Sequence, residues 1–546
     1  MSTAAAVPVV VVPPVRRTAP LRAVSGLALR GCRRGGAVLV VATAGMTAVV
    51  TATYGEVTAS APGGVSALAV LAGNPAIRTL FGEPVALDTA GGFTVWRTGA
   101  ALGVLLGVWA LLTATRLLRG EEDAGRWTLL ASGPVRAGAM ALRVVLVVVA
   151  VPVVAGAGAA AALVAAGEPG GGALVHGAGL ALTGAYYAAV GALAAQVFPR
   201  RAAAAGAATA VLAAGLLSRM VGDGLPELGW LRWLSPFGLT ALAAPFHTDR
   251  VVPLVVLAGA AAAAVALVPL LADRRDVGEG YVRPGRRRSR LALLGSPTAF
   301  AARGATGPLL GWSVGVGAYF LLIGLLTVSL TGFLADNASF AHLAARAGFA
   351  DLDRDAGYAA TLFALLALPV GAFATARIGA LAADEAARRL ALLLAGPLTR
   401  TRLLVAHAGV AAVAAAALTA VAGTAFWAGA AVAGSPLTLG DALAGALNTL
   451  PVALLALGAA VLAIGWVPRA TVAVGALPVV GGFTWHVVAG STGAPRWVAD
   501  VSPFAHLAAV PAAPASVPAT VVMLCVAVAA TAVGLVGYRR RDLRSA

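Results

Sequence analysis

Lysine is absent from all 546 residues, so the 39 basic residues are all arginine. A P-loop needs a lysine that reaches the phosphates of ATP, and its absence excludes such a site in this chain. Two cysteines, Cys32 and Cys525, are too few for a disulfide framework or a zinc site. Charged residues make up only 11% of the sequence, against roughly 25% in soluble domains. The 60% hydrophobic content and the mean hydropathy of +0.90 predict a membrane protein instead.

Apolar runs long enough to cross a bilayer occur along the whole chain. A membrane-spanning helix needs about 20 apolar residues, because its backbone groups find no water partners in hydrocarbon. The sequence predicts an all-α polytopic membrane protein with about twelve transmembrane helices. The predicted spans are 37–54, 98–118, 140–165, 173–196, 202–220, 251–272, 310–334, 358–381, 403–430, 442–467, 470–490 and 517–538. An N-terminal signal peptide is a poor match, because the apolar run 5–14 is short and broken by proline.

The net charge of +17 could indicate nucleic-acid binding, but the arginines occur in short clusters between apolar runs. With twelve spans, both termini lie on the same side of the membrane. The termini and the loops on that side hold 31 arginines and 9 acidic residues, and the loops on the other side hold 8 arginines and 13 acidic residues. Arginine asymmetry of this kind marks the cytoplasmic side of a membrane protein. We therefore expect a multi-pass protein of the bacterial cytoplasmic membrane with both termini cytoplasmic, and no nucleic-acid partner.

Two loop segments are similar to each other. Glu121–Pro134 reads EEDAGRWTLLASGP and Asp384–Pro397 reads DEAARRLALLLAGP, so that seven of fourteen positions coincide. Composition bias explains the matched alanines and leucines but not the aligned Glu, Arg and Gly-Pro. Three more motifs recur in the same order: Leu29-Arg30-Gly31 with Ala302-Arg303-Gly304, Ser235-Pro236-Phe237 with Ser502-Pro503-Phe504, and Arg274-Arg275-Asp276-Val277 with Arg540-Arg541-Asp542-Leu543.

These repeats predict two parallel six-helix halves that form a pseudodimer. The predicted domains are a cytoplasmic segment 1–36, a first transmembrane domain 37–280, an arginine-rich linker 281–292, a second transmembrane domain 293–538 and a tail 539–546. Segment 1–36 is either an amphipathic helix on the inner leaflet or a plain basic flank. Parallel repeats place a path or site between the halves, which is a transporter geometry, although a scaffold could also be duplicated.

The acidic residues bear on the energy source. Proton-coupled antiporters use carboxylates inside the bilayer, whereas all 22 acids here fall in loops or at span edges. His407 and His486 are clearly intramembrane, and each is expected to form a hydrogen bond between helices; His176 lies at a span edge. If ATP drives transport, the ATPase must be a separate subunit.

The repeated loops are the predicted docking sites for such a subunit, and two similar surfaces suit two identical ATPases. Acidic residues at the start of each short helix interact favourably with the helix dipole, and the Gly-Pro pair ends the helix. The alternative is a pair of interfacial helices whose apolar side chains enter lipid. The docking residues are predicted as Glu121, Glu122, Arg126, Trp127, Leu130, Gly133 and Pro134 in the first loop and Asp384, Glu385, Arg389, Leu390, Leu393, Gly396 and Pro397 in the second.

Five kinds of segment carry a family resemblance: the first loop, the second loop that repeats it, the two RRD motifs, NPAIRTLFG (74–82) and GGFTVWR (91–97). Together they resemble the fused twelve-helix ABC-2-type permeases. These permeases include actinobacterial exporters of polyketide antibiotics, among them the tetronasin exporters. The resemblance covers almost the whole chain. The second loop departs from the first, because Ala386 replaces Asp123 and Arg388 replaces Gly125.

The resemblance implies export of amphipathic antibiotics or drugs. It implies a separate ATP-binding-cassette subunit, in two copies, that binds ATP and magnesium, and no cofactor or metal in this chain. It further implies that the repeated loops are coupling helices and that 222–249 and 491–516 form short re-entrant helices. The low-ranking candidates for a substrate path are Trp109, Tyr186, Tyr187, Phe363, Trp427 and Trp485, most of which are expected to serve helix packing or interface anchoring. A secondary drug antiporter and a membrane-embedded enzyme are the alternatives; the sequence offers no convergent catalytic set for the latter.

Overall fold

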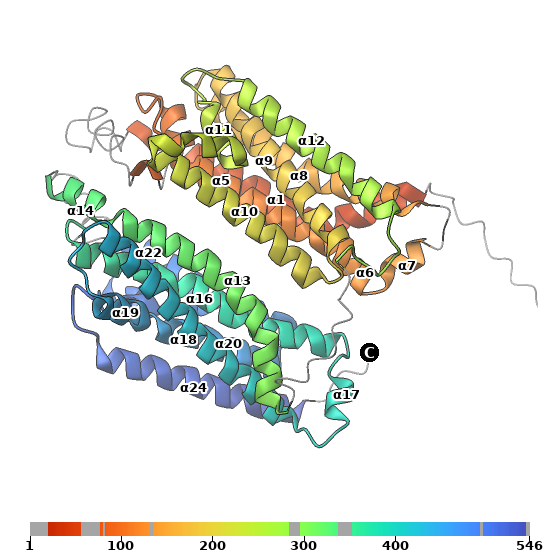
Figure 1. Cartoon of the computed structure of the whole chain (residues 1–546), viewed down its shortest axis with the longest axis vertical. Coiled ribbons are helices and arrows are strands. Elements are labelled where there is room, and N and C mark those ends of the chain that lie inside the picture. Colours follow the sequence, from red (N-terminus) through yellow and green to blue (C-terminus); the bar gives the residue numbers. More distant parts are fainter. Residues whose placement is uncertain are drawn as a thin grey trace, which may run out of the picture. The chain divides into compact units, whose positions relative to one another are not determined.

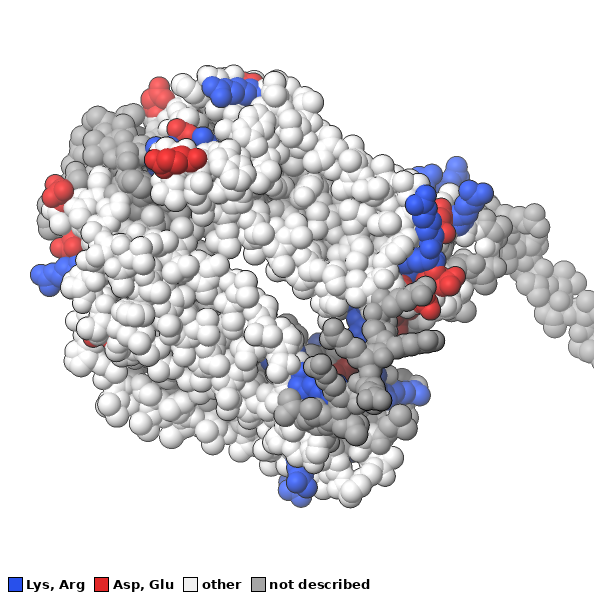
Figure 2. Space-filling view, viewed as in Figure 1, with Lys and Arg blue, Asp and Glu red and all other residues white. Residues whose placement is uncertain are grey.

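Eleven long apolar helices make up most of the computed structural model, which describes residues 20–55, 77–79, 82–131, 133, 135–282, 295–336, 352–491 and 495–541. The regular elements among these residues are all helical, as the sequence predicts. A helix satisfies every interior backbone N–H and C=O within its own segment, which hydrocarbon requires. In Figure 2 the visible charged side chains lie toward the ends of the long helices, and the surface between them is uncharged.

The first unit comprises Met1–Thr51, Thr98–Leu212 and Ala243–Pro284. Its helices α8 and α9 pack so closely that a Cβ added at Gly156 would lie 2.2 Å from the carbonyl oxygen of Gly177. Small residues at such crossings let two backbones approach within van der Waals contact. The long helices of this unit are α1 (Pro20–Ala52), most of α5 (Ala90–Thr115), α8 (Ala137–Ala165), α9 (Gly170–Val197), the first half of α10 (Arg201–Gly224) and α12 (Val252–Asp273) (Figure 1).

The second unit comprises Ala52–Arg97, Ala213–Leu242 and Gly285–Ala546. Its largest core contains Phe363, which stacks on Phe320 and meets Phe426 edge-on. Its helices are α13 (Pro297–Leu325), α14 (Thr327–Asp336), α16 (Asp355–Ala386), α18 (Arg400–Val432), α19 (Leu439–Asn448), α20 (Leu450–Trp466) and α24 (Val517–Arg540) (Figure 1). Short helices occupy the segments before α12 and α24: η2 (Pro226–Leu234), α11 (Pro236–Leu242), α23 (Arg496–Ala499) and η5 (Pro503–His506).

Eleven of the twelve predicted spans coincide with helices that are long and apolar enough to cross a membrane within the described part of the chain. The exception is 470–490, so the structure shows eleven such helices among the described residues, and the twelfth span stays a prediction. That stretch is divided into α21 (Thr471–Ala476), a π-helical turn η4 (Leu477–Gly481) and α22 (Gly482–Ser491). The π-helical turn lies at Pro478, which has no N–H to donate to the preceding turn.

Corresponding contacts occur at the repeated motifs. The hydroxyl of Ser235 donates to the carbonyl of Gly215 at 2.6 Å, and that of Ser502 to Gly482 at 2.8 Å. Likewise Arg116 donates to the carbonyl of Gly31 at 2.8 Å, and Arg377 to that of Gly304 at 3.1 Å. The prediction of two similar halves is supported by these contacts and stays a prediction.

The stretch 471–491 decides the topology of the C-terminal end. If it crosses the membrane, cysteine introduced at Ala512 reacts with an impermeant maleimide added outside, and cysteine at Arg540 does not. Both positions are exposed. The measurement uses whole cells and a background in which Cys32 and Cys525 are alanine. Ala166→Cys, in the loop between α8 and α9, is the positive control. Labelling at 540 but not at 512 would contradict a twelfth crossing.

Candidate functional site

The first repeated loop begins where α5 ends. A π-helical turn η1 (Arg116–Gly120) leads into α6 (Glu121–Asp123), and α7 (Arg126–Ala131) follows. Gly125 joins the two short helices with φ +73°, a left-handed conformation that glycine adopts without steric cost. The expected short helix is therefore two helices with a tight turn between them.

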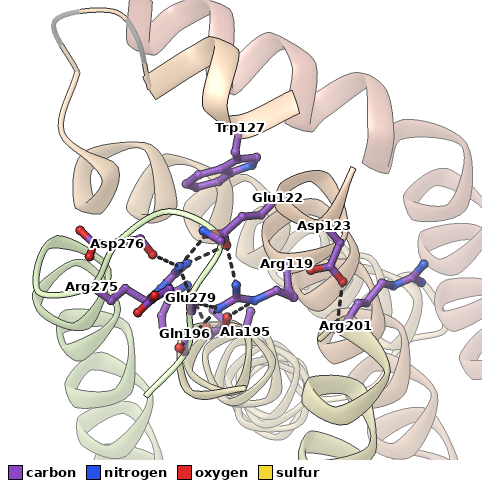
Figure 3. Close-up of polar contacts among 12 residues, drawn as sticks. Arg119, Glu122, Asp123, Trp127, Ala195, Gln196, Arg201, Arg275, Asp276 and Glu279 are labelled. Atoms are coloured by element: carbon purple, nitrogen blue, oxygen red, sulfur yellow. Dashed lines mark hydrogen bonds and ion pairs between the residues drawn. The ribbon is translucent and has the colours of Figure 1, made fainter. Parts of the chain in front are cut away.

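Glu122 forms the centre of an ion-pair network inside the first unit (Figure 3). The Arg275 guanidinium donates from Nη1 to Oε1 at 2.6 Å and from Nη2 to Oε2 at 2.8 Å. The backbone N–H of Gly278 donates to the same Oε1 at 2.6 Å. Glu122 is only 7% exposed, so these partners offset the cost of removing its charge from water. The network ties the loop to the segment that follows α12.

Arg119 and Gln196 complete the network. Nη1 of Arg119 lies 3.2 Å from Oε2 of Glu122, and its Nε donates to the carbonyl of Ala195 at 2.8 Å. The side-chain oxygen of Gln196 accepts from Nε of Arg275 at 2.9 Å. These contacts join the end of α5, the end of α9 and the segment after α12 (Figure 3). A displacement of the loop must therefore break buried charged hydrogen bonds or move these helix ends with it.

Trp127 points inward, into the core of the first unit. It is 5% exposed, and its indole N–H donates to the carbonyl of Leu117 at 3.3 Å. Leu130 is half-buried against the same core. The loop's accessible side is formed instead by the turn between the two short helices and by one side of α7, including the exposed Arg126 and Thr128. The Glu121 carboxylate accepts from Arg126 and raises the pKa of its guanidinium, which remains charged.

The second loop has a related geometry. Glu385 lies 2.7 Å from Nη2 of Arg541, whose carbonyl accepts from Arg400 at 2.8 Å. Arg541 and Arg275 hold the same place in the two RRD motifs, as Glu385 and Glu122 do in the loops. Arg389 lies 3.0 Å from the Asp384 carboxylate, the counterpart of the pair between Arg126 and Glu121. Leu390, the counterpart of Trp127, is likewise buried, whereas Leu393 is exposed.

The two loops differ in how firmly they are held. Arg388 has φ +57° where the first loop has Gly125, and a residue with a Cβ is strained by about 1–2 kcal/mol there. The Asp123 carboxylate accepts from the backbone N–H of Arg201 at 2.9 Å, and Ala386 cannot replace this bond. The side chain of Glu385 is 11% exposed, against 2% for Glu122. The first loop is therefore the more firmly anchored.

The Gly-Pro pairs follow the short helices, as the sequence predicts. The helix α7 ends at Ala131, before Gly133, and α17 (Ala391–Leu394) ends before the exposed Gly396 and Pro397. Pro134 lies outside the described residues, as does most of the predicted linker 281–292.

The aromatic candidates for a substrate path are mainly packing residues. Tyr187 and Phe363 are fully buried, and Trp109 contacts the glycines of α1 from α5. Tyr186 packs edge-on against Tyr187, and Trp427 is half-buried against the core around Phe363. Trp485 is 46% exposed, and its N–H donates to Val498.

A charged cluster in the second unit escaped the sequence analysis. Nε of Arg219 lies 2.6 Å from Oδ2 of Asp223, and both side chains are almost completely buried near the end of α10. Arg232 lies 2.7 Å from Glu83 and 3.7 Å from Asp223. The cluster holds the segment that begins at Gly82 against α10 and η2. Arg219 and Asp223, at helical i,i+4 spacing, were the available sequence signal.

Among the described residues, neither His407 nor His486 makes the expected hydrogen bond to another helix. Nε2 of His176 and Nε2 of His407 are buried and have no hydrogen-bond partner among the described residues. His486 lies on the exposed side of α22. Arg275, Arg541 and Gln196 were also missed as loop partners, although the recurring RRD motif pointed to the two arginines.

The eleven candidate spans, with charged networks gathered at helix ends, define a polytopic membrane protein. Residues 294–539 match the family described as the C-terminal domain of the multidrug efflux system permease Rv1217c. The chain is similar to the multidrug efflux system permease protein Rv1217c of Mycobacterium tuberculosis, with 29% identity over 484 residues. This similarity covers 88% of the chain and 87% of that protein.

Removal of the Glu122 carboxylate leaves Arg119 and Arg275 close together without their common partner. We expect Glu122→Ala to destabilise the first unit by about 3–5 kcal/mol, the usual cost of breaking a buried ion pair from one side. Glu385→Ala should cost less, about 1.5–3 kcal/mol, because its pair is partly hydrated. The melting temperatures of the purified variants measure the difference.

Glu121→Ala is the matched control, because its pair with Arg126 is exposed and such pairs contribute about 0–1 kcal/mol. A melting temperature for Glu122→Ala no lower than that of Glu121→Ala would show that the network does not anchor the loop.

Proposed function

We propose that this chain is the permease subunit of an ATP-binding-cassette exporter, which moves amphipathic drugs or antibiotics out of a bacterial cell. The drug-efflux part rests on the similarity to a multidrug efflux system permease over most of both chains. Energy comes from a separate ATPase, because the chain has no lysine for a P-loop. Two ATPase copies bind ATP and magnesium, and both termini of the permease are cytoplasmic.

The single structural observation that carries the ATP-driven mechanism is the pair of similarly built loops. Each loop joins a carboxylate, buried in Glu122 and partly buried in Glu385, to an arginine just beyond the last helix of its predicted half. Each also presents an ion-paired arginine, Arg126 or Arg389, on its exposed side. Two such surfaces suit two identical ATPase subunits. The buried network then transmits force, and the exposed arginines meet the ATPase.

Motion is transmitted in this mechanism through charged hydrogen bonds rather than through flexible loops. When the ATPase subunits close on ATP, they push the two loops. The network around Glu122 joins the loop to the ends of α5, α9 and α12, so these ends move with it. Such coupled displacement changes which side of the membrane the substrate path faces. Because the link is rigid, the displacement is passed to the helices and is not absorbed by bending of the loop.

The energy source distinguishes this mechanism from an ion-driven antiporter. Inverted membrane vesicles that contain the chain and its ATP-binding subunit should accumulate a fluorescent amphipathic dye when ATP and magnesium are added. Accumulation should persist with a protonophore, and vesicles with the permease alone should show none. The purified chain should bind no ATP at micromolar concentrations. Dye accumulation driven by a pH gradient without ATP would establish the antiporter instead.

The exposed arginines test the docking surface separately from the buried network. We expect Arg126→Ala to lower ATP-dependent dye transport about tenfold, because a lost charge-assisted hydrogen bond costs about 1.5–3 kcal/mol. Arg389→Ala should have a similar or smaller effect, and the double variant should be nearly inactive. Arg143→Ala, an exposed arginine of α8 outside both loops, is the control. Normal transport by the double variant would show that the ATPase docks elsewhere.

A further inference from the structure

A groove with a volume of about 390 Å³ lies between α1 and α8 of the first unit. Its lining is mostly apolar; the polar side chains in it are those of Ser25 and Arg33. Small residues on both helices keep side chains out of this space, and Gly36 brings α1 close to Val151 beneath it. The residues that the argument uses are Leu29, Arg33, Gly36 and Val40 of α1 and Val151 and Val154 of α8.

The charge at the groove is unbalanced. Arg33 lines it, and Arg30 and Arg34 flank Arg33 on the same helix; all three are exposed. Within the described part of the chain, no carboxylate forms an ion pair with any of these three arginines. An arginine beside an apolar groove, without an acidic partner in the chain, is complementary to a ligand with a negative head and an apolar tail.

The groove follows the direction in which a lipid would lie. The uninterrupted apolar part of α1 begins directly after Arg34, so Arg33 lies where the helix enters the hydrocarbon. At 1.5 Å per residue, Val40 is roughly 10 Å farther along the helix. Arginine at this depth extends its guanidinium to the headgroup level while its stem lies along apolar surface. The charged end of the groove is therefore at the interface and its apolar end is within the bilayer.

We propose that this groove binds an anionic phospholipid, whose phosphate pairs with Arg33 and whose acyl chain lies along Val40, Val151 and Val154. The arginine asymmetry places this end of α1 at the cytoplasmic leaflet, where anionic lipids concentrate basic side chains. A basic pocket between transmembrane helices on that side is a known form of anionic-lipid site. Its volume is at the low end of the about 300–1,000 Å³ of drug pockets, which suits one acyl chain better than a bulky antibiotic. The proposal does not depend on the energy source or the substrate of the transporter.

The test uses the full chain in lipid vesicles and two photoreactive probes with identical diazirine-bearing acyl chains. One probe is a phosphatidylglycerol and the other is a phosphatidylcholine. We expect the anionic probe to label peptides of α1 and α8 about fivefold more than the neutral one, the preference expected for one arginine at the surface. Unlabelled phosphatidylglycerol should compete for labelling, and phosphatidylcholine should not.

Neighbouring arginines supply the matched variants. Arg33→Gln should reduce labelling by the anionic probe to the level of the neutral probe, whereas Arg34→Gln, which does not line the groove, should leave it unchanged. Val154→Trp should block labelling by filling the apolar end, and this variant keeps every arginine. Gel filtration shows that each variant is folded before labelling.

Three outcomes would overturn the proposal. These are equal labelling by the two probes, equal loss of labelling in Arg33→Gln and Arg34→Gln, and labelled peptides outside α1 and α8. Displacement of the probe by an uncharged amphipathic drug at the same concentration as phosphatidylglycerol would identify the groove as a drug site instead.

Discussion

The backbone of this protein must form its hydrogen bonds without water over most of its length, and the rest of the structure follows from that constraint. Hydrocarbon leaves the helix as the simplest arrangement that satisfies each N–H and C=O within one segment. Since lipid is as apolar as the side chains, hydrophobic burial cannot bring the helices together. Contact instead depends on small residues such as Gly156 and Gly177, where two backbones meet directly. The abundance of glycine and alanine is therefore a packing requirement.

The same constraint moves charge to the helix ends, where it is used in networks. Glu122 is nearly as buried as a core residue, yet its partners come from a helix end and from the segment that follows α12 in its own unit. A carboxylate held by a bidentate arginine, a second arginine and a backbone N–H resists displacement in any single direction. This makes the loop a rigid extension of the helices. The exporter that we propose needs such rigidity, because force applied to a compliant loop would not reach the membrane-spanning helices.

The two loops have the same proposed role, but different contacts anchor them. The first uses glycine in its left-handed turn and an aspartate that bonds the start of α10. The second has an arginine with positive φ in that turn and a less buried carboxylate. Both still carry an exposed arginine beside an acidic residue. The shared features are those that a repeated partner would contact, while the features that differ are internal to the chain. In the proposed exporter, the first loop therefore transmits motion more rigidly than the second.

Much of this protein was determined by sequence patterns that act locally. Length and continuity of apolar runs located eleven of the spans, because helix formation in lipid depends on each segment alone. The absence of lysine excluded a P-loop, and the repeated motifs located both loops. Only the tertiary structure decided what the side chains in those loops do. Trp127 and Glu122 looked like docking residues, but both point inward, toward partners 10 and more than 150 positions away. The pairing of Arg232 with Glu83 and its approach to Asp223 also depend on neighbours that periodicity does not reveal. Local pattern shows where a charge occurs in the chain, and the fold alone determines which opposite charge it meets.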